Sequence, residues 1–232
     1  MSENIKITHN NNKKTDENIV KNYEKITIKI LIVGEPGVGK SNFISRFIDN
    51  KFMSTNLSTV CFNSNYKTLN FGNKNIIVQL WDSAGKFAYK SITQSLFNRV
   101  HGIIILYDIT NLKSFEYVEK WINFIEEENK KIIYNIAGNK CDLNESRQVD
   151  EKEGKKLGNK YRINFIETSA KMNINITECI NNLVKKIIDC VELENNPTFA
   201  LDERSYKFKG KATNERFVNI FTLFITQFNA YL

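Results

Sequence analysis

Short apolar runs alternate with longer amphipathic stretches along most of this chain, and this alternation restricts the possible folds more than any other property of the sequence. The runs are rich in Ile, Val and Leu and end at Gly or Asp; they are ITIKILIVG (26–34), NIIVQLWD (75–82), HGIIILYD (101–108) and KIIYNIAG (131–138). Runs of this length predict strands, several of them buried on both faces as in a parallel sheet. A further short strand is expected over residues 162–166.

The stretches between the runs have helical periodicity. Apolar residues recur at helical spacing in the clearest case, at positions 115, 118, 121, 122 and 125. Helices are expected over residues 40–50, 89–99, 114–127, 151–159 and 174–191. This order predicts a doubly wound α/β fold with a six-stranded, mostly parallel sheet and helices on both faces. The loops that follow the parallel strands should then meet at one edge of the sheet.

Composition divides the chain into four parts. One folded domain is expected over residues 25–191, after a flexible polar leader (1–24) and before a polar linker (192–216). The last part, from Phe217 to Leu232, has apolar residues on one helical face but is too short to span a bilayer comfortably. Three roles stay open for it: contact with a membrane interface, docking in a partner groove, or packing on the folded domain.

Charge and cysteine content limit the compartment and the partners. The net charge of +7 comes from scattered lysines without zinc-finger spacing, so no nucleic-acid partner is expected. The four cysteines form no CxxC pair and no N-terminal apolar segment precedes them, which indicates a reduced, cytoplasmic protein. No cysteine lies near the C-terminus to accept a prenyl group, so peripheral association with endomembranes stays an open expectation.

The segment GEPGVGKS (34–41) fits the phosphate-loop pattern G-x-x-x-x-G-K-[ST], between a predicted strand and a predicted helix. Backbone N–H groups of such a loop wrap a polyphosphate, the helix N-terminus faces it, and the Lys40 ammonium reaches its β and γ oxygens. The Ser41 hydroxyl suits Mg²⁺. The residues expected to contact the nucleotide here are Gly34, Glu35, Pro36, Gly37, Val38, Gly39, Lys40, Ser41 and Asn42.

Two later loops favour guanine over adenine. In NKCD (139–142), the Asp142 carboxylate is placed to accept hydrogen bonds from guanine N1–H and its N2 amino group, with Lys140 along the base plane and Asn139 bracing the loop. In ETSAK (167–171), the turn Ser169, Ala170 and Lys171 can offer a backbone N–H to guanine O6. The phosphate loop alone also fits an ATPase or a small-molecule kinase, and these two loops speak against that alternative.

The segment WDSAG (81–85) closes the strand before it. Asp82 is placed for a water-mediated contact with Mg²⁺, and the Gly85 N–H for a contact with the γ-phosphate. The competing interpretation of Asp82 is a helix N-cap.

These four motifs, in this order and spacing, resemble those of the Ras superfamily of small GTPases, and HGIIILYDITNLKSFEYVEKW is similar to the Rab version of its region. The resemblance covers about residues 25–190. It implies a switch that binds GTP and GDP with Mg²⁺, hydrolyses GTP and acts in vesicle trafficking. It also implies effectors, exchange factors and activating proteins that bind from Lys51 to Asn65 and from Gly85 to Arg99.

The same resemblance assigns further residues. It places the Mg²⁺-binding threonine of the first switch at Thr59, and at Phe52 the aromatic ring that packs edge-on to guanine, although an ordinary core Phe also fits position 52. Loss of the γ-phosphate would release the Thr59 segment. The residues that would act in hydrolysis are Lys40, Thr59, Gly85 and the residue at position 86.

Position 86 departs from the family pattern. Lys86 replaces the glutamine that orients the attacking water, and an ammonium has donors but no acceptor for that water. Slow hydrolysis is therefore expected, and a GTP-loaded scaffold with negligible hydrolysis is the alternative. Pro36 is a second departure, which either stiffens the phosphate loop or obstructs the arginine of an activating protein.

Overall fold

The computed structural model describes residues 24–54, 63–71, 74–83, 96–97, 99–128 and 132–195. The chain forms two compact units, Met1–Ile188 and Asp189–Leu232. All the strands that the structure describes belong to the first unit. In the second unit, the described residues are the last turns of the C-terminal helix.

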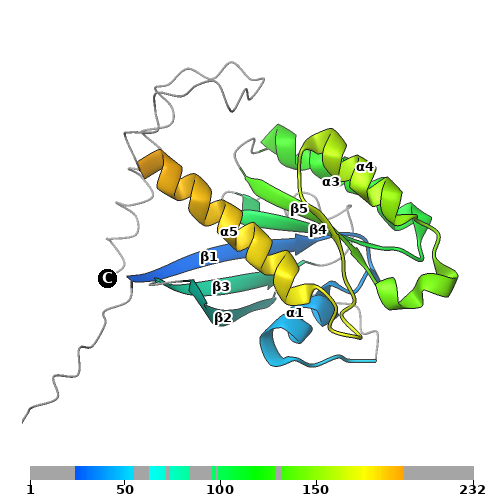
Figure 1. Cartoon of the computed structure of the whole chain (residues 1–232), viewed down its shortest axis with the longest axis horizontal. Helices are drawn as coiled ribbons and strands as arrows, with labels where there is room; N and C mark the ends of the chain where they lie inside the picture. The colour runs from blue at the N-terminus through cyan, green and yellow to red at the C-terminus, as the bar shows by residue number, and fades with distance from the viewer. Residues whose placement is uncertain are drawn as a thin grey trace, which may run out of the picture. The chain divides into compact units, whose positions relative to one another are not determined.

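The first unit is built on one six-stranded sheet, as the sequence predicts (Figure 1). Its spatial order is β2-β3-β1-β4-β5-β6. Every neighbouring pair is parallel except β2 and β3, which run antiparallel. The strands are β1 (Glu24–Val33), β2 (Asn63–Phe71), β3 (Lys74–Asp82), β4 (Gly102–Asp108), β5 (Ile133–Asn139) and β6 (Phe165–Glu167).

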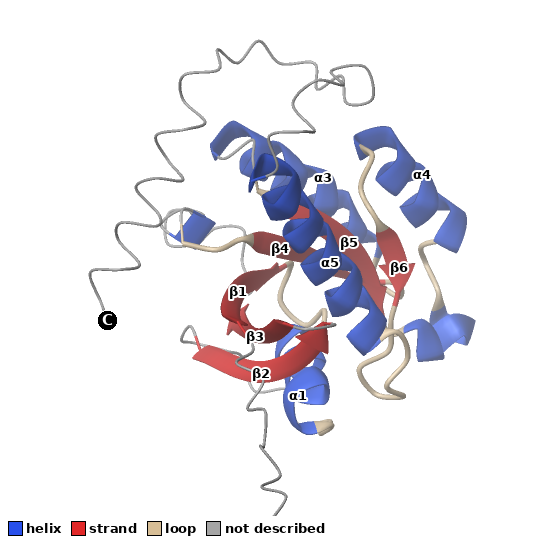
Figure 2. Cartoon of the chain, turned by 60° about the vertical axis from the view of Figure 1, so that its left-hand side comes forward, coloured by secondary structure: helices blue, strands red, loops and turns tan. Residues whose placement is uncertain are grey.

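Helices cover both faces of this sheet. Helices α1 (Lys40–Asp49) and α5 (Ile176–Asn195) lie on one face, and α3 (Leu112–Glu128) and α4 (Glu151–Tyr161) lie on the other (Figure 2). A short 3₁₀ helix, η2 (Cys141–Ser146), follows β5. The arrangement confirms the predicted doubly wound α/β fold.

Two hydrophobic clusters fill the space between sheet and helices. The α1/α5 cluster contains Phe43 and Phe47 of α1 and Ile180 of α5, and the α3/α4 cluster contains Trp121 of α3 and Leu157 of α4. Successive residues of β1 alternate between the two clusters, and so do those of β4. Both central strands are thus buried on both faces, which accounts for their continuous apolar sequences.

The ends of several elements differ from the sequence-based expectation. The last strand begins at Phe165 rather than at 162, because Arg162 adopts a left-handed conformation (φ 56°) and ends α4, and Ile163 N–H bonds back to the carbonyl of Gly158. Helix α5 continues to Asn195, past the expected end at 191. Strand β2 was not expected at its position. Of the helix expected over 89–99, the described residues include Leu96 and Phe97, which are helical.

Within the part of the chain that the structure describes, no helix combines the length and the apolarity that crossing a bilayer requires.

Candidate functional site

Three glycines give the loop between β1 and α1 its shape. Gly34, Gly37 and Gly39 have φ angles of 143°, 79° and 96°, in the region that favours glycine. A Cβ on Gly34 would lie 2.0 Å from the backbone oxygen of Leu106, and a Cβ on Gly39 would lie 2.6 Å from Asn139 Nδ2. Among the described residues, and apart from its chain neighbours, no atom lies within 4 Å of a Cβ placed on Gly37. The loop is therefore tightly enclosed at its two ends and open in the middle.

Lys40 is the first residue of α1, and its side chain turns back into the loop. It is only 6% exposed, and its Nζ donates to the carbonyl oxygens of Gly34 (2.9 Å) and Glu35 (3.0 Å). Burial lowers the pKa of Lys40 to about 8, although the nearby carboxylates of Asp82 and Glu35 act in the opposite direction. A buried cation beside a helix N-terminus is suited to binding an anion, and the wrapped glycine-rich backbone fits a polyphosphate.

Ser41 and Asp82 meet where α1 begins and β3 ends. Ser41 Oγ donates to Asp82 Oδ2 at 2.6 Å, and the neighbouring Ser83 Oγ donates to the carbonyl of Ile32 at 2.7 Å. A hydroxyl and a carboxylate are the oxygen ligands that Mg²⁺ takes, and Mg²⁺ needs only one or two protein groups when phosphates supply the rest. Among the described residues, no group of three His, Cys, Asp or Glu side chains is placed to hold a metal. The oxygens of Ser41 and Asp82 therefore fit a Mg²⁺ ion whose other ligands come from phosphates.

Asn139, at the end of β5, joins the loops of three strands. Its Nδ2 donates to the carbonyl of Val38 in the phosphate loop at 2.8 Å. Its Oδ1 accepts from Ala170 N–H at 3.2 Å and from Thr168 Oγ1 at 3.3 Å. Asn139 is 1% exposed, so these bonds are protected from water. The phosphate loop and the loop after β6 are held at a fixed separation by one amide.

Asp142, three residues further on, is oriented from the loop after β6. The buried Ser169 donates from Oγ to Asp142 Oδ1 at 2.5 Å and accepts from Met172 N–H at 2.9 Å. Ser169 and Ile174 also exchange backbone hydrogen bonds, which close the turn between them. The carboxylate of Asp142 is thus placed beside the Ser169–Lys171 turn, the pairing expected of a guanine-reading site.

Lys140 lies between Asn139 and Asp142 in a left-handed conformation (φ 66°). Its Nζ forms an ion pair with Asp108 Oδ2 at 2.6 Å. The other oxygen of Asp108 accepts from the backbone N–H and the hydroxyl of Thr110. The long stem of Lys140 therefore extends from β5 across to the end of β4.

The family is decided by comparison with known proteins. The family model described as "Ras family" matches residues 29–189. Ras-related protein Rab-8A of Bos taurus is 39% identical over 170 residues, which is 73% of this chain and 82% of the relative. Ras-related protein Rab-8B of Homo sapiens is 38% identical over 171 residues, with the same coverage of each chain. The chain belongs to the Ras family. It is a Rab-like small GTPase with a Ras-like G domain.

The other residues expected at the site of this small GTPase differ in exposure, and some of them lie outside the described residues. Pro36 is exposed in the phosphate loop, Val38 is buried, and Phe52 is 40% exposed after the end of α1. Asn42 makes two hydrogen bonds with the backbone of Met53: its Nδ2 donates to the carbonyl at 2.9 Å and its Oδ1 accepts from the N–H at 2.8 Å. Thr59, Gly85 and Lys86 lie outside the described residues.

The sequence motifs did not include two residues that organise this site. Asp108 fixes Lys140, and Arg46 of α1 bonds to the carbonyls of Ala170 and Lys171. Asp108 had a detectable signal, since it ends an apolar strand at the edge where the motif loops meet. Arg46 had none, because it lies inside a helix and its acceptors are 124 and 125 residues away.

Proposed function

We propose that this Rab-like GTPase is a switch that binds GTP and GDP with Mg²⁺ and hydrolyses GTP slowly. The observation that carries the proposal is Asn139, which bonds both to the phosphate loop and to the turn beside Asp142. One amide thus sets the distance between the groups suited to a polyphosphate and the groups suited to guanine. Guanine preference would come from Asp142 and from the turn Ser169, Ala170 and Lys171.

Nucleotide identity is tested on the full chain. The nucleotide that co-purifies is identified and its conversion followed over time, and stripped protein is titrated by calorimetry with GDP, GTP and ADP in the presence of Mg²⁺. We expect tight binding of both guanine nucleotides and weak binding of ADP, with the preference lost in Asp142→Ala. Equal affinity for ADP in the unmodified chain would contradict the proposal.

The Mg²⁺ site is proposed at Ser41 and Asp82, with Asp82 acting through a water molecule and Thr59 completing the shell. Their oxygens would hold the ion, and the bound ion would supply positive charge that offsets the charge of the phosphates. Ser41→Ala should weaken GDP binding in Mg²⁺ more than in EDTA. Equal weakening in both conditions would remove Ser41 from the proposed ion site.

The rate of hydrolysis depends on position 86. Lys40 and Gly85 would stabilise the phosphates, but Lys86 has no acceptor for the attacking water, so we propose a long-lived GTP state. Single-turnover assays compare the unmodified chain with Lys86→Gln, which should be faster. No measurable turnover in the unmodified chain would favour the alternative, a GTP-loaded scaffold.

The partners proposed are effectors, exchange factors and activating proteins of vesicle trafficking, which would bind from Lys51 to Asn65 and from Gly85 to Arg99. The apolar face from Phe217 to Leu232 is proposed as a contact with a membrane or a partner groove. Liposome flotation of the full chain and of a variant lacking residues 212–232 separates these two, since only a membrane contact predicts flotation that the truncation abolishes.

A further inference from the structure

Arg46 makes an unusual set of hydrogen bonds between α1 and the loop after β6. Its Nε donates to the carbonyl of Ala170 at 2.8 Å, and its Nη2 donates to the carbonyl of Lys171 at 3.0 Å. Its Nη1 donates to the carbonyl of Asn50 at 2.7 Å and to Asn50 Oδ1 at 2.9 Å. Four acceptors therefore occupy three nitrogens of one guanidinium, whose rigid planar fork fixes their relative positions.

The acceptors on the loop belong to the turn that is expected to face guanine. In a trans peptide the carbonyl and the following N–H point in opposite directions, and the described chain contains no cis peptide bond. Holding the Ala170 carbonyl toward α1 therefore turns the Lys171 N–H away from α1. The preceding N–H, of Ala170, donates to Asn139 Oδ1 at 3.2 Å. Arg46 and Asn139 together fix the orientation of both amides in the turn.

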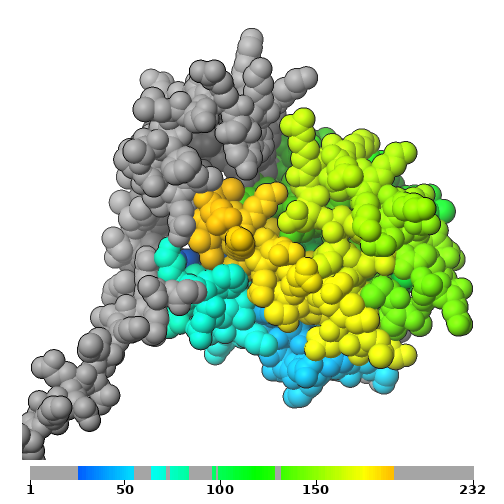
Figure 3. Space-filling view, in the orientation of Figure 1, coloured from blue at the N-terminus to red at the C-terminus, as the bar shows by residue number. Residues whose placement is uncertain are grey.

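The helix end that carries Arg46 is itself well held. Asn50 ends α1 in a left-handed conformation (φ 56°), and its N–H bonds to the carbonyl of Arg46 at 3.1 Å. Asn173, just beyond the turn, donates from Nδ2 to Asn50 Oδ1 at 3.3 Å. The surfaces of α1 and of the segment after β6 adjoin in the space-filling view (light blue and yellow in Figure 3).

We propose that Arg46 is a positioning residue for recognition of the 6-oxo group of guanine. Guanine presents an acceptor at O6, whereas adenine presents an amino donor there, so an amide of fixed direction discriminates between them. Hydrogen bonds from a charged donor are about twice as strong as neutral ones, which makes Arg46 effective at holding the turn. This inference rests on the proposed function, since it assigns the selectivity of that same site.

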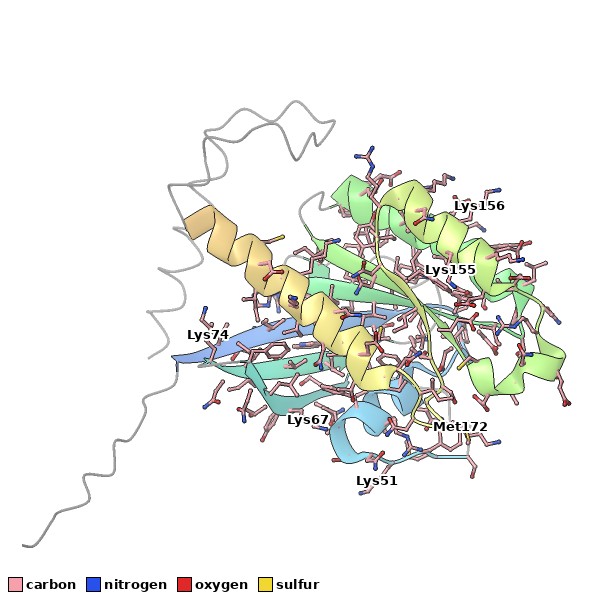
Figure 4. The ribbon with its side chains drawn as sticks, viewed as in Figure 1. Lys51, Lys67, Lys74, Lys155, Lys156 and Met172 are labelled. Atoms are coloured by element: carbon pink, nitrogen blue, oxygen red, sulfur yellow. The ribbon has the colours of Figure 1, made fainter. Side chains whose placement is uncertain are left out.

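The chain offers a matched control at the same end of α1. Lys67 of β2 donates from Nζ to the carbonyl of Phe47 at 2.7 Å, so it also places a cation on the last turn of α1. Its Nζ also lies over the Phe47 ring, 5.0 Å from the centroid, and in the view of Figure 4 Lys67 and Met172 are labelled on opposite sides of α1. Removal of Lys67 therefore disturbs the helix end without releasing the turn.

The experiment compares two nucleotides on the stripped full-length protein. GDP carries the 6-oxo group, and 2-aminopurine riboside diphosphate keeps the 2-amino group and the phosphates but lacks both the 6-oxygen and the N1 proton. The missing N1 proton affects the contact with Asp142 in every variant alike, so a change of the affinity ratio between variants reports on the 6-oxo contact. In Arg46→Met we expect GDP to bind about tenfold more weakly, equivalent to about 1.4 kcal/mol, while affinity for the analogue stays nearly unchanged. The GDP affinity of Arg46→Lys should lie between those of the unmodified chain and Arg46→Met. Lys67→Met should leave the ratio of the GDP affinity to the analogue affinity unchanged.

The outcomes separate this inference from the proposed function. If the unmodified chain does not prefer GDP over the analogue, the proposed guanine site is wrong. If it does, but Arg46→Met weakens both nucleotides equally or leaves the ratio unchanged, Arg46 has only a structural role and the inference is overturned. The melting temperature of each variant, measured without nucleotide, shows separately how much stability the substitution costs.

Discussion

At the scale of single residues, a few buried polar side chains join loops that are far apart in the sequence. Asn139 bonds to Val38, Thr168 and Ala170, and Ser169 bonds to Asp142. Each of these bonds is shielded from water at one partner or both, so no solvent molecule replaces it readily if one partner is lost. The geometry of the site is thus sensitive to substitutions that change few atoms.

Asn139→Ala should weaken GDP binding. The substitution leaves the Val38 carbonyl and the Ala170 N–H without their partner, at a cost of about 1–3 kcal/mol for each buried group left unsatisfied. The dissociation constant for GDP, measured by calorimetry, should rise at least tenfold. Asn70→Ala, at an exposed position of β2, is the control and should change it little. A normal GDP affinity in Asn139→Ala would show that the two loops keep their spacing without this amide.

His101 gives the protein a pH-dependent stability. Its Nδ1 accepts from Lys29 N–H at 2.9 Å, and burial, with the nearby Lys29 charge, lowers the pKa of His101 to about 4. The unfolded chain binds a proton there near pH 6.5 and the folded chain only near pH 4, so the unfolded state binds more protons between these values. The free energy of unfolding should therefore fall by about 3 kcal/mol as pH is lowered through that window.

Denaturant unfolding at a series of pH values measures this effect against His101→Asn. The asparagine can accept from Lys29 N–H but does not titrate, so its profile should be flatter between pH 6.5 and pH 4. Parallel profiles for the two proteins would show that His101 is not responsible for the loss of stability.

At the scale of elements, α1 begins at the phosphate loop and also holds the chain that follows its end. The amide of Asn42 pairs with the backbone of Met53, eleven residues further on. This pairing holds the segment that contains Phe52, the ring expected to pack against guanine, close to the first turn of the helix. The first turn of α1 therefore contacts the phosphate loop through Lys40 and the segment beside Phe52 through Asn42.

Asn42→Ala should speed nucleotide release. Each exposed hydrogen bond contributes about 0.5–1.5 kcal/mol, so loss of both should raise the dissociation rate of a fluorescent GDP analogue by about fivefold or more. Asn42→Asp keeps the acceptor and loses the donor. Its dissociation rate should lie between those of the unmodified chain and Asn42→Ala. An unchanged rate in both variants would mean that residues 51–54 do not limit release.

Strand and helix identities could be predicted where apolar periodicity is strong. The strands β1, β3, β4 and β5 are recognisable as apolar runs because at least one face of each is buried in a hydrophobic cluster. Strand β2 was not, since its only clear apolar positions are Leu69 and Phe71 and its other inward residue is Lys67, which is accommodated by bonding to a carbonyl of α1. The signal that was available is Gly72-Asn73, a two-residue turn pair between two strand-like runs.

The site could be predicted only as far as the motifs extend. Lys40, Ser41, Asp82, Asn139 and Asp142 were recognisable because their chemistry follows from their spacing after strands. Asp108 had a weaker signal, its place at the end of an apolar strand. The contacts of Arg46 depend on which loops the fold brings together, and no local pattern encodes that.

At the scale of the whole molecule, one sheet separates the two hydrophobic clusters. Residues of β1 and β4 contribute to both, so neither cluster can be lost without exposing the strands that support the other. Both tryptophans, Trp81 and Trp121, belong to or pack against the α3/α4 cluster. Tryptophan fluorescence therefore reports on one face of the sheet.

Ile180→Ala, in the α1/α5 cluster, should destabilise both faces together. Ile180 is fully buried, and truncation of such a residue costs about 2–5 kcal/mol. In urea, with GDP and Mg²⁺ held at fixed saturating concentrations, the midpoints from fluorescence and from far-UV circular dichroism should shift by the same amount. A shift in circular dichroism alone would show that the two faces unfold independently.

The antiparallel pairing of β2 with β3 also has a mechanical consequence. Asn63, the first residue of β2, lies opposite Asp82, the last residue of β3, so the chain enters and leaves this hairpin at adjacent points beside Ser41. A slip of two residues in the pairing would carry that entry point roughly 7 Å from the carboxylate. The register of the hairpin therefore sets how far Asn63, where the described part of β2 begins, lies from the Asp82 carboxylate that is proposed to contact Mg²⁺.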